Sequence, residues 1–463
     1  MHYLCTYKNV HIMEISELYK IFTQHPTVTT DSRDCPKDSL FFALKGASFD
    51  GNKFAAMALE KGCAYAVVDE AEYATDPRCI LVDDCLDTLQ QLARYHRRQL
   101  ATPIIGITGT NGKTTTKELT AAVLRKRYNV LYTQGNFNND IGVPKTLLQL
   151  TSRHDIAVVE MGASHPGDIK KLVEVVEPDY AIITNVGRAH LQGFGSFEGV
   201  IKTKGELYDF MRQRGTWEAP KSPIIDKYQK RCVFIDAENP YLQSIAQGLN
   251  LVSYGCTDNN NLWVNAKIEG NGPMLKFVWR HNSGSFHSVG HETPTHLIGS
   301  YNITNMLAAI SVGLYFHVAP DLITDALCNY VPSNNRSQFE QTADNKLIVD
   351  AYNANPTSMA AAIANFNEIE AQRKMVIIGD MKELGTVSHD EHQKIVDSLK
   401  ASKIDTVWLV GTEFEGCSTP DNFRLFDNVE QVKETIATEK PQGMYILIKG
   451  SNSTKLYQLP ELL

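Results

Sequence analysis

The stretch Gly106-Ile-Thr-Gly-Thr-Asn-Gly-Lys-Thr-Thr115 lies between a short apolar run, Ile104 to Thr108, and a helix-like run, Thr115 to Arg127. A strand, a glycine-rich loop and a helix in this order are typical of a phosphate-binding loop, because backbone N–H groups and the positive end of the helix dipole attract phosphate oxygens. Lys113 can reach the outer phosphates, and the Thr114 hydroxyl can bind Mg²⁺. The glycine spacing departs from the strict Gly-x-x-x-x-Gly-Lys pattern. We nevertheless predict a nucleotide site here rather than a simple glycine-rich turn.

The runs that follow this loop predict a parallel sheet. They are short, apolar and separated by helix-like segments, which is the pattern of strands covered on both faces. These runs are Asn129 to Tyr132, Ile156 to Met161 and Tyr180 to Asn185. Since the carboxyl ends of parallel strands meet in one crevice, residues that follow these strands are candidate neighbours of the bound phosphates.

Three residues near these strand ends are candidates for catalysis: Glu160, His190 and Lys204. Taken singly, each has an ordinary explanation, as a turn carboxylate, a loop histidine and a lysine on a solvated helix face. Their convergence at neighbouring strand ends favours a catalytic site over these explanations. We therefore predict that they act together with Lys113.

The last third of the chain alternates apolar and helix-like runs again, which predicts a second doubly wound unit. The predicted strands are Leu347 to Asp350, Met375 to Ile378, Thr406 to Val410 and Tyr445 to Ile448. The predicted helices are Ser358 to Ile369, His389 to Leu399 and Val429 to Ala437. Ser388-x-x-Glu391 fits a capping box at the start of one of them. The expected fold class is therefore α/β.

Length and composition limit the classes of function. The 463 residues are enough for roughly three domains, and a helix-like stretch, Leu86 to Leu100, followed by Thr102-Pro103 marks the end of the first. The net charge of -8 disfavours a nucleic-acid-binding protein. Nine scattered cysteines indicate reduced thiols, as in cytoplasm. We expect neither a secretory signal nor insertion into a membrane.

Two further segments carry structural expectations. The charged stretch Arg212 to Arg231 interrupts the alternation and predicts a surface insertion. The motif His291-Glu-x-x-x-His296 resembles a zinc-binding helix, but its second histidine comes one residue late and Pro294 would break the helix. We therefore expect the histidines from His281 to His296 to lie in loops.

Taken together, these motifs resemble those of the ATP-dependent Mur ligases of cell-wall precursor synthesis, over nearly the whole chain. The motifs follow the family order: Gly109 to Thr115, Gly135 to Pro144, Glu160 to Ala163, Thr184 to His190, Lys202 to Glu206 and Asn302 to Ala309. Asp350-Ala-Tyr-Asn-Ala-Asn-Pro356 and Gly379-Asp-Met-Lys-Glu-Leu-Gly385 are similar to motifs of the member that adds D-alanyl-D-alanine.

The resemblance implies three domains: a small N-terminal α/β domain that binds a UDP-sugar (1–100), a central P-loop ATPase domain with a parallel sheet (101–332), and a C-terminal Rossmann-like domain that binds the amino substrate (333–463). It implies that a cytoplasmic monomer uses ATP and Mg²⁺ to add D-alanyl-D-alanine to UDP-N-acetylmuramoyl tripeptide through an acyl phosphate. Another Mur-type or folylpolyglutamate-type ligase, or a P-loop ATPase that switches a partner, remains as an alternative.

The resemblance also assigns site residues. The ATP-binding set is Gly109, Thr110, Asn111, Gly112, Lys113, Thr114, Thr115, Asn302, Arg336 and Asp350. The substrate-binding set is Ser32, Arg33, Lys45, Gly46, Asn138, Asn139, Asn353 and Asn355. The metal-binding set is Thr114, Glu160, His190 and Lys204, the last as a carbamate formed with carbon dioxide. Lys202 is the competing carbamate position. Two departures from the family pattern are Asn452, where relatives carry Arg, and Ile235-Asp-Ala-Glu238 in place of Asn-Ala-Asp.

Overall fold

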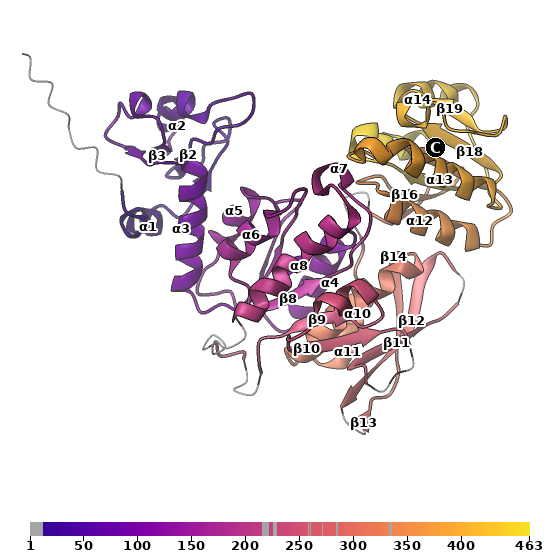
Figure 1. Cartoon of the computed structure of the whole chain (residues 1–463), viewed down its shortest axis with the longest axis horizontal. Helices are drawn as coiled ribbons and strands as arrows, with labels where there is room; N and C mark the ends of the chain where they lie inside the picture. The colour runs from indigo at the N-terminus through magenta and orange to yellow at the C-terminus, as the bar shows by residue number, and fades with distance from the viewer. Residues whose placement is uncertain are drawn as a thin grey trace, which may run out of the picture.

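The computed structural model of the chain describes residues 13–214, 222–225, 229–257, 259, 261–270, 272–283, 286–332 and 336–463. These residues form three β-sheets that follow one another along the chain, each with its own helices (Figure 1). Figure 1 shows the N-terminal and C-terminal domains at opposite ends of the molecule, with the largest domain between them. The expected α/β fold with three domains is confirmed.

The first sheet is small and entirely parallel, in the order β1-β2-β3-β4. Its strands are Val28–Thr29, Leu40–Phe42, Tyr65–Val68 and Cys79–Leu81, and its helices are α1 (Ile15–Gln24), α2 (Ala55–Glu60) and α3 (Cys85–Gln99). The Asp84 side chain caps α3 by accepting from the backbone N–H of Asp87 at 2.7 Å. Near the other end of α3, Arg97 donates to Asp179 of the central domain at 2.9 Å, and both side chains are buried. This contact ties the first domain to the second.

The central sheet has ten strands, of which nine follow the order β13-β12-β11-β10-β9-β8-β5-β7-β6, while β14 pairs with β12. Neighbouring strands run parallel from β6 to β11 and antiparallel beyond. Strands β5, β7 and β8 are wholly buried, which explains why their sequences are almost entirely apolar. The strands are β5 (Ile104–Thr108), β6 (Val130–Tyr132), β7 (Ile156–Glu160), β8 (Tyr180–Ile183), β9 (Val233–Asp236), β10 (Leu251–Gly255), β11 (Val264–Ile268), β12 (Met274–Ser283), β13 (Phe286–His287) and β14 (His291–Ile298).

Helices cover both faces of the central sheet and create two separate apolar cores. One core includes side chains of α5, α6 and α8, and the other includes side chains of α4, α10 and α11. The helices of this domain are α4 (Lys113–Leu124), α5 (Gly142–Leu147), α6 (Asp168–Val176), α7 (Leu191–Phe194), α8 (Phe197–Arg214), α9 (Pro240–Ile245), α10 (Ile303–Tyr315) and α11 (Pro320–Cys328). With both faces covered, the accessible part of the sheet is the edge at which its strands end.

The third sheet has the order β15-β16-β20-β17-β18-β19, parallel except for β15. Its strands are Gln338–Gln341, Lys346–Asp350, Lys374–Gly379, Thr406–Val410, Arg424–Phe426 and Tyr445–Lys449, given from β15 to β20 in chain order. Its helices are α12 (Pro356–Glu368), α13 (Ser388–Lys400) and α14 (Val429–Thr438).

The predicted capping box at Ser388 is wrong. Ser388 is the first residue of α13, and no side chain caps that helix. Its hydroxyl instead donates to Glu413 at 2.6 Å, and Glu391 accepts from Arg188 of the central domain at 3.1 Å. A capping box does occur at α12, where the Asn355 side chain accepts from the backbone N–H of Ser358 at 2.9 Å.

The expectation that the histidines lie in loops is also wrong. His281 belongs to β12, and His291 and His296 belong to β14. Pro294 pairs with Lys276 of β12 next to a shift in register, a place where a strand tolerates a missing N–H donor. The zinc-type helix is absent from this segment.

The predicted insertion from Arg212 to Arg231 begins inside α8, which continues to Arg214. Residues 215–221 and 226–228 of that prediction lie outside the described residues. In the described part of the chain, no helix combines the length and apolar character needed to span a bilayer.

Candidate active site

The glycine-rich loop joins β5 to α4, as the sequence predicts. Gly112 precedes α4 in a left-handed conformation, with φ of 76°, and a Cβ atom there would lie 2.4 Å from Oδ1 of Asn305. Gly109 has φ of 145°, and its Cβ would lie 2.0 Å from the Thr184 hydroxyl. Both positions therefore need glycine, and the turn presents its backbone N–H groups and the N-terminus of α4 to the same space.

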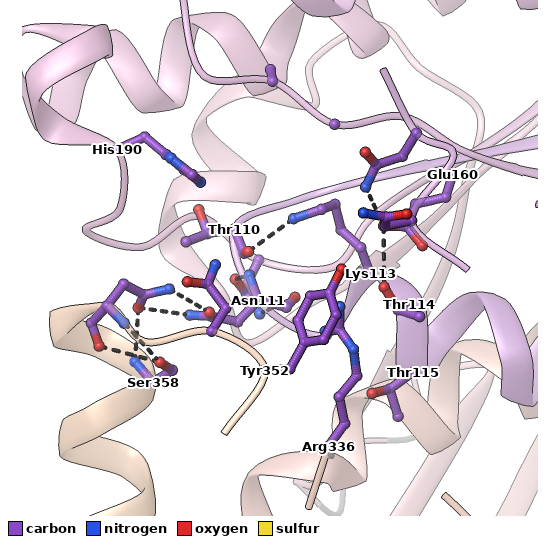
Figure 2. Close-up of a pocket in the computed structure, with 18 of the residues that line it drawn as sticks. Thr110, Asn111, Lys113, Thr114, Thr115, Glu160, His190, Arg336, Tyr352 and Ser358 are labelled. Carbon is purple, nitrogen blue, oxygen red and sulfur yellow. Dashed lines mark hydrogen bonds between the residues drawn. The ribbon is translucent and has the colours of Figure 1, made fainter. Parts of the chain in front are cut away.

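Lys113 is held by this loop. Its ammonium group donates to the carbonyls of Gly109 at 2.9 Å and Thr110 at 3.0 Å, as Figure 2 shows in part. Burial lowers the pKa of Lys113, while the nearby Glu160 carboxylate opposes that shift. The loop carbonyls therefore hold the ammonium group at the wall of the cavity, where it can bind a phosphate.

A cavity of about 710 Å³ lies at this end of the central sheet and reaches the C-terminal domain. Fifteen of the predicted site residues line it: Thr110, Asn111, Gly112, Lys113, Thr114, Thr115, Asn138, Asn139, Glu160, His190, Asn302, Arg336, Asp350, Asn353 and Asn355. The remaining predicted residues do not line it: Gly109, Lys204, Ser32, Arg33, Lys45 and Gly46.

Glu160 ends β7 and faces the loop. Its Oε1 atom accepts from the Asn138 amide at 2.8 Å and from the Thr114 hydroxyl at 3.2 Å (Figure 2). Its Oε2 atom is buried and has no hydrogen-bond partner among the described residues. An unpartnered carboxylate oxygen beside a phosphate loop fits a cation ligand. Asn138, predicted to touch substrate, here orients this carboxylate.

Lys204 lies on α8 behind the cavity wall. Its side chain is only 2% exposed; the ammonium group is 3.5 Å from the Ala163 carbonyl and 5.4 Å from the Phe194 ring centre. Burial first and the Lys113 charge second hold the pKa of Lys204 well below its usual range. Lys202, the competing position, is exposed.

His190 precedes α7 and lines the cavity from the side opposite Glu160 (Figure 2). Burial lowers the pKa of His190, and a carboxylate of the C-terminal domain, Glu383, opposes the shift. The Nδ1 atom of His190 is hydrogen-bonded to Oε2 of Glu383. Within the described residues, no group of three or more His, Cys, Asp or Glu side chains could hold a metal. A cation here would therefore need hydroxyl, water or phosphate oxygens as well.

Arg336 enters the cavity from the C-terminal domain. Its guanidinium lies 3.7 Å from the centre of the Tyr352 ring, a stacked cation–π arrangement, and its Nε atom is buried without a partner among the described residues (Figure 2). Asp350 accepts from Lys449 at 2.5 Å. Tyr352 was not among the predicted site residues, although it belongs to the motif that contains Asp350.

The loop also contacts the C-terminal domain through amides. Asn355 donates to Asn111 at 2.7 Å, and the backbone N–H of Asn111 donates to Asn185 at 2.9 Å (Figure 2). Asn302 and Asn139 have local partners instead: Asn302 donates to the Ile298 carbonyl at 2.7 Å, and Asn139 accepts from the Gly142 N–H at 2.8 Å.

The four predicted residues of the N-terminal domain are separate from this cavity. Arg33 is 88% exposed and pairs with Asp31 at 2.8 Å. Lys45 pairs with Asp69 and Glu70, each at 2.9 Å. The backbone carbonyl of Ser32 accepts from Lys61, and a Cβ on Gly46 would collide with the Phe49 ring. Their binding role stays a prediction.

Comparison with known proteins identifies the family. Residues 107–313 match the model of the Mur ligase middle domain, residues 335–452 the Mur ligase, glutamate ligase domain, and residues 26–97 the Mur ligase family, catalytic domain. A relative from Bacillus subtilis (strain 168), named UDP-N-acetylmuramoyl-tripeptide--D-alanyl-D-alanine ligase, is 34% identical over 93% of this chain and 92% of its own. The protein of that name from Escherichia coli (strain K12) is 33% identical with the same coverage.

Solved structures agree with the sequence relatives. A crystal structure of MurF from Acinetobacter baumannii superposes with a TM-score of 0.80 at 30% identity, covering 94% of this chain and 92% of that one. MurF from Thermotoga maritima, solved in complex with ADP, has a TM-score of 0.80 at 24% identity, covers 95% and 97%, and supports the fold. Because these matches span all three domains, the chain belongs to the Mur ligase family.

Proposed function

We propose that this chain is the ATP-dependent ligase that adds D-alanyl-D-alanine to UDP-N-acetylmuramoyl tripeptide in peptidoglycan precursor synthesis. The observation that carries the proposal is the 34% and 33% identity, over 93% of the chain, to relatives named for that reaction. The cavity adds a physical reason, because it is lined by both the phosphate loop and the Asp350 to Pro356 motif. A P-loop ATPase that only switches a partner would not need the Asp350 to Pro356 motif in this cavity.

The chemistry requires activation of a carboxylate, which is a poor electrophile. Transfer of the ATP γ-phosphoryl group to the tripeptide carboxylate gives an acyl phosphate and ADP. The neutral amine of D-alanyl-D-alanine then attacks the carbonyl carbon, and the tetrahedral intermediate expels phosphate and loses a proton. Lys113 and the loop N–H groups would hold the phosphates, and Arg336 lies where it can stabilise the transferred group.

Thr114, Glu160 and His190 are the residues that would hold Mg²⁺. The unpartnered Oε2 atom of Glu160 and the adjacent Thr114 hydroxyl fit a hard cation. When bound, Mg²⁺ neutralises charge that develops on the phosphoryl oxygens. The Asn138 amide keeps the Glu160 carboxylate turned toward the loop.

Lys204 is proposed as the carbamate. Its neutral amine nitrogen would attack the carbon of carbon dioxide and lose one proton, giving an anionic carbamate. Only a neutral amine can do this, and the lowered pKa of the buried Lys204 supplies it. Exposed Lys202 lacks that environment. The anion would also remove the repulsion between Lys204 and a nearby Mg²⁺.

The other substrates are assigned by domain. Residues 1–100, with Ser32, Arg33, Lys45 and Gly46, would bind the UDP-sugar, and residues 101–332 would bind ATP. Residues 333–463, with Asn353 and Asn355, would bring the amino substrate. We propose a cytoplasmic monomer.

The test is product mass. Purified protein is incubated with ATP, UDP-N-acetylmuramoyl tripeptide and D-alanyl-D-alanine, and the nucleotide-sugar product is weighed by mass spectrometry. We expect the tripeptide to gain one D-alanyl-D-alanine unit less water, together with ADP and phosphate. Parallel reactions with L-glutamate plus folate, or with single amino acids, test the related ligases. ATP hydrolysis without any elongated product contradicts the proposal.

A further inference from the structure

One of the contacts between the central and C-terminal domains lies beside His190. Residues 188–192 of the central domain face residues 383–391 of the C-terminal domain. Arg188 donates to Glu391 at 3.1 Å, the Gln192 N–H donates to the Glu383 carbonyl at 3.2 Å, and Leu191 packs against the apolar core of the C-terminal domain. His190 lies in the middle of this contact.

His190 and Glu383 both adopt a left-handed backbone conformation, with φ of 49° and 62°. This conformation is unfavourable for residues with a Cβ atom and persists only where the surrounding contacts impose it. The contact between their side chains does not repay that strain, because these side chains are 32% and 57% exposed and even a fully charged pair in such a place contributes little to stability. We therefore looked to function, and not to stability, for the role of the contact between His190 and Glu383.

The geometry of the pair separates the two ring nitrogens of His190. The Nδ1 atom donates to the Glu383 carboxylate, which leaves the lone pair on Nε2. His190 lines the cavity, and Figure 2 shows its ring directed toward Thr110 and Lys113. The carboxylate thus fixes both the tautomer and the direction of the ring, as carboxylates do for functional histidines elsewhere.

We propose that Glu383 is a positioning residue: it comes from the C-terminal domain and holds His190 of the central domain as the Nδ1–H tautomer, so that Nε2 faces the cavity when the two domains are docked. Docking of the domain that carries the amino substrate would thereby complete the site that activates the carboxylate. Only the kinetic part of this inference rests on the proposed function.

The tautomer of His190 can be measured by NMR, in the absence of both turnover and metal. Protein with ¹⁵N-labelled histidine is examined at pH 8.5 by long-range ¹H–¹⁵N correlation, which distinguishes protonated from unprotonated ring nitrogens. His190→Gln identifies the His190 signals among those of the 14 histidines. We expect the Nδ1–H form in the wild type and in Glu383→Gln, whose amide oxygen can still accept, and a shift to the Nε2–H form in Glu383→Ala.

Kinetics supply the second measurement. We expect Glu383→Ala to lower kcat roughly 10- to 100-fold while KM for ATP changes little, as for other residues that orient a functional histidine. Glu383→Gln should recover most of that loss. Glu383→Gly, which suits the backbone conformation, replaces the alanine variant if that one fails to fold.

Glu391→Gln is the matched control, because it weakens a neighbouring contact between the same domains without touching His190. It should retain the Nδ1–H tautomer and most of kcat. The inference is overturned if Glu383→Ala keeps the wild-type tautomer, or if its kcat equals that of Glu391→Gln. A wild type without ligase activity would refute the proposed function, while the tautomer experiment would still decide the role of Glu383.

Discussion

Predicted binding residues lie in two regions: the cavity at the end of the central sheet, and the surface of the N-terminal domain that carries Arg33 and Lys45. The two regions differ in whether these polar side chains already have partners. At the cavity, side chains from several strand ends and from a second domain face one space, and some of their polar atoms, such as Oε2 of Glu160, have no partner among the described residues. On the N-terminal domain, Arg33 and Lys45 each pair with neighbouring carboxylates. Polar groups left unpaired in a shared cavity indicate a ligand more strongly than motif residues that are already paired.

The largest effect should come from Lys113. Lys113→Ala removes the cation that the loop holds among the expected phosphate positions, and we expect kcat to fall by about 10³-fold or more. Phosphate release and elongated product should fall together. Lys126→Ala, just beyond the end of the same helix and paired with Asp325, is the control and should stay near wild type. Normal product formation by the Lys113→Ala enzyme would contradict the conclusion that the cavity binds the phosphates of ATP.

Lys204 tests whether burial, rather than contact with the cavity, makes a residue functional. We expect Lys204→Ala to lower kcat by about 100-fold, as loss of a metal-site group does. Short-chain carboxylic acids should restore part of the activity by replacing the carbamate oxygens. Lys202→Ala, two residues away and exposed, should keep most turnover. The reverse result, with rescue at Lys202, would move the carbamate to that position.

Local pattern was sufficient to predict much of the fold and the loop. The strand and helix around Gly106 to Thr115 follow from residue order, and the rule for parallel strand ends predicted that Glu160 and His190 would approach Lys113. These predictions needed only information from short segments. The binding roles of Ser32 and Gly46 were assigned by resemblance, and no contact in the structure tests them.

Contacts between domains were beyond prediction. Glu383 reaches His190 only because two domains dock, and no spacing within a segment encodes that. Tertiary contacts also explain the failed capping box, because Ser388 donates to Glu413 of its own domain and Glu391 accepts from Arg188 of the central domain. Pro294 predicts a loop for the histidines, but they lie in strands because a shift in register accommodates the proline.

Arg33 tests the N-terminal domain, where the predicted binding residues are already paired and the expected effect is moderate. If Arg33 binds the UDP-sugar, Arg33→Ala should raise KM for that substrate about tenfold with little change in kcat, the size of one charge-assisted hydrogen bond. Arg78→Ala is a close structural match, because Arg78 pairs with Asp76 in the same bidentate way two residues apart on the same domain. Equal KM values for the two variants would mean that Arg33 only stabilises its own turn.

The smallest effect is expected at Asn355. This residue lines the cavity, yet its side chain is already paired with its own helix. Asn355→Ala should destabilise the C-terminal domain by about 1 kcal/mol, the usual loss for a helix cap. It should also raise KM for ATP about threefold, because the contact with Asn111 in the phosphate loop disappears. Asn428→Ala removes the same kind of cap from α14, where Asn428 accepts from Glu430 and Gln431. Thermal unfolding should show similar losses for both variants, whereas only Asn355→Ala should change KM. If both leave KM unchanged, the contact between Asn355 and Asn111 serves the helix alone, and lining the cavity is not enough to make a paired residue functional.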